Sequence, residues 1–237
     1  MSEPTTNAPP IVLIHGLWMT ARSWDRWAQY YRARGYEVVV PTYPGFEIEV
    51  EALREKPEII AAASVPETLD HLSDVVENLD RPPIIMGHSF GGTFTQLLVN
   101  RGLGAAAVTI DSAPPEGVRV NPPSQIKSLF PILANPANRH RAVGFTREQF
   151  HYAFANTCSR EESDAAYDRL HIPAPRQLGV DLRPDSQLEA GPPGDLGRLR
   201  PGRPGAAAVH HGRQGPPDAA LGDPLEREEV PQLRGSD

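Results

Sequence analysis

Residues 84–92 restrict the possible fold of this chain more than any other segment does. They read Ile-Ile-Met-Gly-His-Ser-Phe-Gly-Gly, so an apolar run leads into Gly-x-Ser-x-Gly, and an amphipathic stretch follows at 93–99. This order is typical of a nucleophile elbow, in which the serine occupies a strained turn between a strand and a helix, and side chains at Gly87 or Gly91 would collide with their neighbours. The pattern predicts that the turn presents the Ser89 hydroxyl to a substrate carbonyl. The simpler alternative is a glycine-rich turn that caps a helix.

A second motif lies upstream at 11–18, where Ile-Val-Leu-Ile-His-Gly-Leu-Trp ends a buried-strand pattern in His-Gly. With these two motifs, the chain resembles the α/β-hydrolase family over residues 9–175. The resemblance implies an α/β fold with a mostly parallel sheet, helices on both faces and a helical cap. It also implies a serine hydrolase of the carboxylesterase or lipase type that needs no cofactor and acts on an ester-type small molecule. A serine nucleophile argues against the aspartate-dependent dehalogenases and epoxide hydrolases of the same fold.

The resemblance assigns roles to particular residues. Ser89 would be the nucleophile, with Gly87 and Gly91 as the elbow glycines, and the backbone N–H groups of Leu17 and Phe90 would form the oxyanion hole. His15, in the second motif, is better interpreted as a structural histidine that hydrogen-bonds loop backbone than as a catalytic group.

The other members of a catalytic triad are harder to place. Asp111 follows a predicted strand at 106–110, where some members of the fold keep their triad acid, but a turn residue in Asp-Ser-Ala-Pro-Pro is the favoured interpretation. For the general base the sequence offers no candidate, because His71 lies on a predicted helix and His88 points away inside the elbow. The remaining histidines fall in the predicted cap or in the C-terminal segment: His140, His151, His171, His210 and His211. Two alternatives therefore stay open, a non-catalytic ligand-binding relative and a cofactor-free lyase or haloperoxidase.

Strand and helix patterns alternate through the first 111 residues, which predicts a parallel sheet. Apolar residues at helical spacing mark one helix, Ser64 and Glu67 have capping-box spacing before another, and residues 37–40 read as a strand. The helix stripe consists of Trp24, Trp27, Ala28 and Tyr31. We divide the chain into a flexible N-terminus (1–10), an α/β-hydrolase core (11–111), a helical cap (112–175) and a tail (176–237).

The predicted cap contains helix signals without strands. Thr146 and Gln149 form a capping box flanked by the hydrophobic-staple positions Phe145 and Phe150, and a second box begins at Ser159. Caps of this family roof the substrate pocket, so the apolar residues of the segment are candidates to line it or simply to pack its helices. They are Phe130, Ile132, Leu133, Phe150 and Phe154.

The tail at 176–237 differs in composition from the rest of the chain. It holds nine prolines, ten glycines and eight arginines but no Phe, Trp, Tyr, Ile, Met or Lys, which predicts disorder. The family's last strands and helix, its triad acid and its triad histidine belong here, and none is recognisable. Read one nucleotide later, the codons of residues 202–221 can encode an apolar strand that ends in an Asp-bearing loop. We therefore interpret the tail as the product of a frameshift near Arg176, the alternative being a genuine Pro/Gly/Arg-rich segment.

Composition narrows the partners and the compartment. A formal net charge of -7 and the absence of a basic run argue against nucleic acid or an anionic membrane as a partner, so a small-molecule substrate is expected. Metal-ligand spacing is not recognisable, His210-His211 included. The single cysteine, Cys158, and the lack of a leader pattern predict a cytoplasmic protein. The oligomeric state is not predicted.

Overall fold

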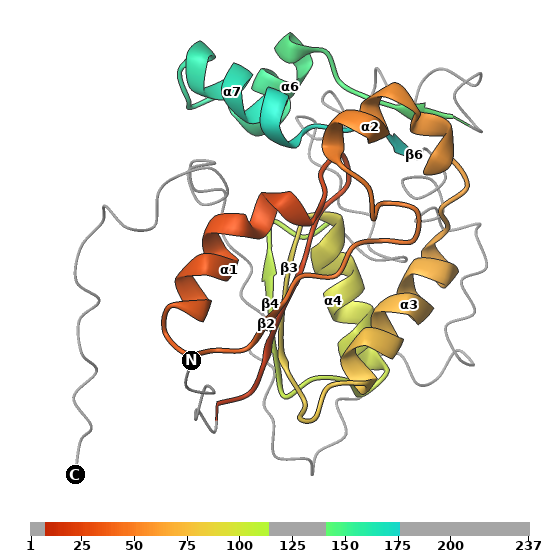
Figure 1. Ribbon diagram of the computed structural model, residues 1–237, viewed down its shortest axis with the longest axis vertical. Helices are drawn as coiled ribbons and strands as arrows, with labels where there is room; N and C mark the ends of the chain where they lie inside the picture. The colour runs from red at the N-terminus through yellow and green to blue at the C-terminus, as the bar shows by residue number, and fades with distance from the viewer. Residues whose placement is uncertain (1–7, 114–140, 176–237) are drawn as a thin grey trace.

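A computed structural model describes residues 8–113 and 141–175 of the chain. Its main sheet has the strand order β2-β1-β3-β4, and every neighbouring pair is parallel. The strands are β1 (Ile11–Ile14), β2 (Val38–Val39), β3 (Ile84–His88) and β4 (Ala106–Ile110). Helices flank this sheet (Figure 1), so the predicted α/β architecture is confirmed.

Side chains alternate between the two faces of the sheet, and each face has its own helices. Ile11 and Leu13 of β1 pack with Trp24 on the face covered by α1 (Asp25–Arg32). Their neighbours Val12 and Ile14 join the larger apolar cluster on the opposite face, under α3 (Val65–Glu77) and α4 (Phe90–Asn100). Strands buried on both sides in this way explain why β1 and β3 read as apolar runs rather than as alternating patterns.

Local features of the sequence account for several helix ends. The Ser64 hydroxyl accepts the Glu67 N–H at the start of α3, and Gly35 and Gly102 have positive φ angles of 83° and 81° just after α1 and α4. Three further short helices are present; the first contains Trp24 of the predicted stripe, and the other two have no recognisable pattern in the sequence. They are η1 (Ala21–Trp24), α2 (Val50–Glu55) and η2 (Pro57–Ile59).

Within the predicted cap, the structure describes two helices and corrects one expectation. Both capping boxes form, at Thr146 before α6 (Arg147–Phe154) and at Ser159 before α7 (Arg160–Leu170). The expectation of helices without strands is wrong, because β5 (Ala142–Val143) pairs antiparallel with β6 (Ala174–Pro175). Two-residue strands are too short to show a period in the sequence. Of the candidate lining residues, Phe150 is fully buried and Phe154 is half-buried, whereas the other three lie outside the described residues.

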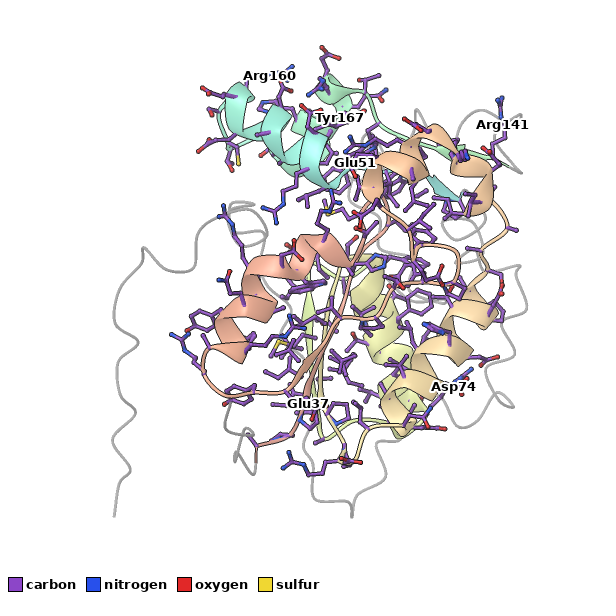
Figure 2. The ribbon with its side chains drawn as sticks, viewed as in Figure 1. Glu37, Glu51, Asp74, Arg141, Arg160 and Tyr167 are labelled. Carbon is purple, nitrogen blue, oxygen red and sulfur yellow. The ribbon has the colours of Figure 1, made fainter. Side chains whose placement is uncertain are left out.

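Helix α2 lies with α6 and α7 beyond one end of the sheet (Figure 1). Figure 2 labels Glu51 on α2 and Tyr167 on α7 in this region, with Glu37 and Asp74 toward the opposite end. The contact between the helices includes Arg54 of α2, which donates to the carbonyl oxygens of Tyr167 at 2.9 Å and His171 at 2.6 Å. The end of α7 is therefore joined directly to the body that contains the sheet.

Several expectations concern residues outside the described ranges. These expectations are the flexibility of the N-terminal segment before residue 8, the part of the predicted cap at 114–140, and the predicted disorder of the tail at 176–237 with the loss of the family's last strands. Among the described helices, none is long and apolar enough to cross a membrane.

Candidate active site

The two sequence motifs meet at one edge of the sheet. Ile14 at the end of β1 is paired with Gly87 in β3, so the His15-Gly16 turn and Ser89 both leave the sheet at its carboxyl end. The strand order also reverses at β1, because β2 lies on one side of it and β3 on the other. In open parallel sheets, this reversal creates the crevice in which ligands bind.

Ser89 occupies a strained turn, and steric conflict explains why glycine is required on either side of it. Its φ and ψ angles are 54° and -118°, and it is the N-cap of α4. A Cβ atom on Gly87 would lie 2.1 Å from the Gly91 carbonyl oxygen, and one on Gly91 would lie 2.2 Å from the Ile14 carbonyl oxygen. The Ser89 N–H donates to the Ile110 carbonyl at 2.9 Å, which fastens the turn to β4. Such backbone strain, on the order of 1–3 kcal/mol, persists only where the surroundings impose it.

The predicted oxyanion donors flank this serine. A Cβ atom on Gly16 would lie 3.1 Å from the Ser89 Cβ, so the loop that carries Leu17 directly approaches the elbow. Phe90 is the first residue of α4, where backbone N–H groups have no partner within the helix and the helix dipole favours negative charge. Neither the Leu17 nor the Phe90 N–H donates to a residue in the described part of the chain. Both groups are thus available to an oxygen atom bound beside Ser89.

His15 fixes the loop and is inaccessible to a substrate. Its side chain is fully buried, and burial lowers its pKa from 6.5 to about 4, an effect only partly opposed by the hydrogen bond to the Gly16 carbonyl. A neutral ring must therefore carry its proton on Nδ1, which donates to the Gly16 oxygen at 2.9 Å. The Tyr43 hydroxyl donates to the His15 carbonyl, and the two ring centroids are 4.0 Å apart. Sequence patterns gave no sign of the contact with Tyr43.

Asp111 follows β4 at the same edge, with a φ angle of 43° and an exposed side chain. Its carboxylate raises the pKa of His88, but burial of that imidazole lowers the pKa more, and the net shift is downward. Within the described ranges no side chain forms a hydrogen bond or an ion pair with Asp111. The structure places Asp111 near the elbow without a histidine hydrogen-bonded to it.

None of the other described histidines forms a hydrogen bond with Ser89. His171 follows α7 and is nearly buried, its Nε2 accepts the Phe145 N–H at 3.0 Å, and burial lowers its pKa to about 4. His71 lies on α3 and His151 on α6. Among the described residues, no histidine is hydrogen-bonded to Ser89, and no group of three or more His, Cys, Asp or Glu side chains is arranged to hold a metal ion. His140, His210 and His211 lie outside those residues.

The structure also has an open hollow of about 340 Å³, and Ser89 is not among the residues that line it. It is formed by η1, α1 and the residues before α2, and its lining includes Arg22, Arg32, Phe46 and Glu49. Arg22 is already paired with Glu49 and Glu51. The hollow contains neither the elbow nor the predicted oxyanion donors, so we give it no part in the chemistry.

Comparisons with known proteins agree with this architecture. A family model described as "Alpha/beta hydrolase family" matches residues 11–233. Among solved structures, an extracellular alpha/beta-hydrolase from a Paenibacillus species is 26% identical, with a TM-score of 0.58 over 72% of this chain and 69% of that one. A methylesterase from Arabidopsis is 15% identical with a TM-score of 0.51, covering 74% and 70% of the two chains. Polyneuridine aldehyde esterase is 16% identical with a TM-score of 0.50, covering 73% of each chain. These last two similarities concern the fold alone. No curated protein matches the chain.

Proposed function

Because the chain belongs to the alpha/beta hydrolase family, we propose that Ser89 is the nucleophile of a serine hydrolase acting on ester-type small molecules. The observation that carries this proposal is a strained elbow at Ser89 against which the Gly16 loop packs, together with adjacent Leu17 and Phe90 N–H groups that have no described partner. A structural turn that only caps α4 does not require the loop after β1 to pack against the serine, as Gly16 does here. The Paenibacillus relative, itself an alpha/beta-hydrolase, supports the reaction class.

In the proposed reaction, the Ser89 oxygen attacks the ester carbonyl carbon and gives up its proton. The carbonyl oxygen becomes negatively charged and accepts hydrogen bonds from the Leu17 and Phe90 N–H groups, which are fixed before the reaction begins. The alcohol then leaves with a proton, and water hydrolyses the acyl-serine to release the acid and restore the hydroxyl. Each donor of this kind is worth roughly 10²–10³ in turnover.

We further propose that this chain is catalytically impaired. In serine hydrolases a histidine takes the proton and an acid orients that histidine, but no described histidine is hydrogen-bonded to Ser89 or Asp111. Asp111 keeps only a proposed role as acid, since it lies at the correct edge of the sheet. Without the histidine, turnover of a serine hydrolase falls on the order of 10⁶-fold, and what remains comes from the oxyanion hole and substrate binding.

The test combines a fluorophosphonate probe with a short p-nitrophenyl ester. We expect the 237-residue chain not to label appreciably: prolonged exposure to a high probe concentration should give only a trace of slow phosphonylation, located on Ser89 by peptide mass spectrometry, and ester hydrolysis should stay close to the uncatalysed rate. Ser89→Ala should remove the adduct. Ser112→Ala is the matched control, because Ser112 is a half-buried serine nearby whose hydroxyl is occupied by Gln96 and the Ala113 carbonyl.

Each outcome separates the open alternatives. Rapid labelling that depends on Ser89 would contradict the impairment and show that a histidine of this chain serves as base. An adduct on another residue, or none after prolonged exposure, would contradict the nucleophile and favour a ligand-binding relative.

A further inference from the structure

Trp18 has a backbone conformation that a bulky aromatic residue rarely adopts. Its φ angle is 65°, in the left-handed region, and its side chain is 9% exposed. Trp18 directly follows Leu17, whose N–H is a proposed oxyanion donor. Left-handed backbone at such a residue is maintained only by contacts that impose it, so the contacts of Trp18 bear on the geometry of the site.

Those contacts come from the segment at 141–175, far away in the sequence. The indole Nε1–H donates to the Val143 carbonyl at 3.0 Å, and the Trp18 carbonyl accepts the Ile172 N–H at 2.9 Å. The ring also packs against Phe145, with centroids 4.8 Å apart, and against Phe154 at 6.3 Å. The helices α6 and α7 form a helical pair. Trp18 is hydrogen-bonded on both sides of this pair: to Val143 in β5, which precedes α6, and to Ile172, which lies between α7 and β6.

We propose that Trp18 is a positioning residue that ties the backbone of Leu17 to the segment carrying α6 and α7. This inference rests on the proposed function of the oxyanion hole. On its other side Leu17 is already held, because His15 fixes the Gly16 carbonyl, which belongs to the same planar peptide as the Leu17 N–H. If Trp18 relaxed to an ordinary φ near -65°, the peptide between Leu17 and Trp18 would turn by roughly 130°. The oxyanion hole therefore keeps its geometry only while α6 and α7 stay in place and Trp18 keeps its hydrogen bonds to Val143 and Ile172.

Hydrogen exchange in the full chain tests the tie without requiring turnover. Trp18→Ala removes the ring and the indole donor, and Trp18→Phe keeps a ring but not the donor. Trp27→Phe is the matched control, since Trp27 is a half-buried tryptophan of α1 that packs on the opposite face of the sheet. We expect amide exchange at Ile172, whose N–H donates to the Trp18 carbonyl, and at 142–146 to accelerate by about tenfold or more in Trp18→Ala and less in Trp18→Phe, with exchange in β3 unchanged. Trp27→Phe should leave both segments as they are.

The slow phosphonylation of Ser89 provides the second measurement. We expect its rate to fall about tenfold in Trp18→Ala, because a displaced Leu17 N–H no longer supports the oxyanion, and to recover partly in Trp18→Phe. Unchanged exchange at Ile172 and at 142–146 in Trp18→Ala would overturn the proposal, as would equal acceleration in β3, which indicates general loosening. If the unmodified chain never labels at Ser89, the proposed function fails, while the exchange data still decide whether Trp18 ties the loop to the helical pair.

Discussion

At the scale of single residues, the site depends on backbone groups that side chains hold in place. The Leu17 N–H and the Gly16 carbonyl belong to one trans peptide and point in opposite directions. By donating to that carbonyl, the buried His15 ring turns the N–H the other way, and Tyr43 restrains the His15 carbonyl in turn. The histidine of the His-Gly motif is thus a buried group that restrains the backbone of the loop.

The elbow glycines give a prediction about stability. In Gly91→Ala the new Cβ meets the Ile14 carbonyl oxygen at 2.2 Å and the His15 carbonyl oxygen at 2.6 Å; the first belongs to the sheet and the second is held by the Tyr43 hydroxyl, so neither moves freely. We expect a loss of about 3 kcal/mol or more in the free energy of unfolding, measured by urea denaturation followed by tryptophan fluorescence. Gly16→Ala is the control, because its closest contacts are 3.1 Å and 3.2 Å and need only small shifts. Equal losses in the two variants would show that close packing at Gly91 is not the cause.

At the scale of elements, the junction of α2 and α7 depends on a helix end. The last carbonyl groups of a helix lack partners within it and carry partial negative charge, which favours a cation there. Arg54 supplies that cation from α2, donating to the carbonyls of Tyr167, Asp168 and His171. One side chain therefore caps α7 and joins it to another helix at the same time.

Arg54→Met should uncap α7 while keeping an apolar stem of similar length. We expect amide exchange at 160–172 to accelerate and the free energy of unfolding to fall by about 1–3 kcal/mol, because up to three carbonyl groups lose a charged donor. Arg160→Met is the control, since Arg160 is exposed and its contact with Glu148 spans 3.9 Å, a pair worth little. A variant as stable as the unmodified chain, with unchanged exchange at the end of α7, would contradict the capping role.

At the scale of the whole molecule, buried neutral histidines link folding to pH. Burial lowers the pKa of both His15 and His171 from 6.5 to about 4. Between these two pH values, the two histidines are mostly protonated in the unfolded chain and mostly neutral in the folded chain. The free energy of unfolding should therefore fall as the pH drops from about 6.5 toward 4. Each histidine contributes a slope of about 1.4 kcal/mol per pH unit within that window and nothing above it.

His171→Gln isolates one of these contributions. The glutamine oxygen can still accept the Phe145 N–H but cannot be protonated in this range. We expect urea denaturation between pH 6.5 and 4 to show a shallower decline in the variant, by about 1.4 kcal/mol per pH unit. Both histidines are neutral at pH 8 in the folded and the unfolded state, so the free energy of unfolding of each protein at pH 8 is the reference for its own decline at lower pH. An unchanged slope would mean that His171 is not the group that couples folding to pH.

The tail at 176–237 leads to a prediction about the gene. We propose that a shift of reading frame near Arg176 replaced the last third of an intact hydrolase, because the composition changes there and residues 202–221 reread sensibly in the next frame. The source DNA should contain an open frame, offset by one nucleotide, that encodes further strands and a histidine. The protein made from that frame should label rapidly with a fluorophosphonate and lose labelling in Ser89→Ala. A gene with no such frame would contradict the proposal and leave a genuine Pro/Gly/Arg-rich tail.

Much of the fold could be predicted because its signals are local. Residues 11–14 and 84–88 are apolar strands ended by glycine motifs, and the capping boxes at Thr146 and Ser159 depend on positions three residues apart. The short α2 and the strand pair β5–β6 could not be predicted, because two to six residues do not establish a period. For the candidate site, the sequence indicated which residues belong to the elbow and the oxyanion loop but not what holds them.

The sequence by itself determined the elbow. Steric conflict at Gly87 arises within the strand-to-helix turn itself, because a Cβ atom there would meet the Gly91 carbonyl oxygen, so the motif predicts the turn before any tertiary contact is known. The conflict at Gly91 is with the carbonyl oxygens of Ile14 and His15 and depends on how β1 packs beside the elbow. Only the tertiary structure decided how Trp18 and Arg54 are used. The left-handed backbone of Trp18 is unfavourable locally and is offset by bonds to residues more than a hundred positions away, and Arg54 caps a helix equally distant in the chain. Contacts of that kind depend on which surfaces meet after folding, and no local pattern records them.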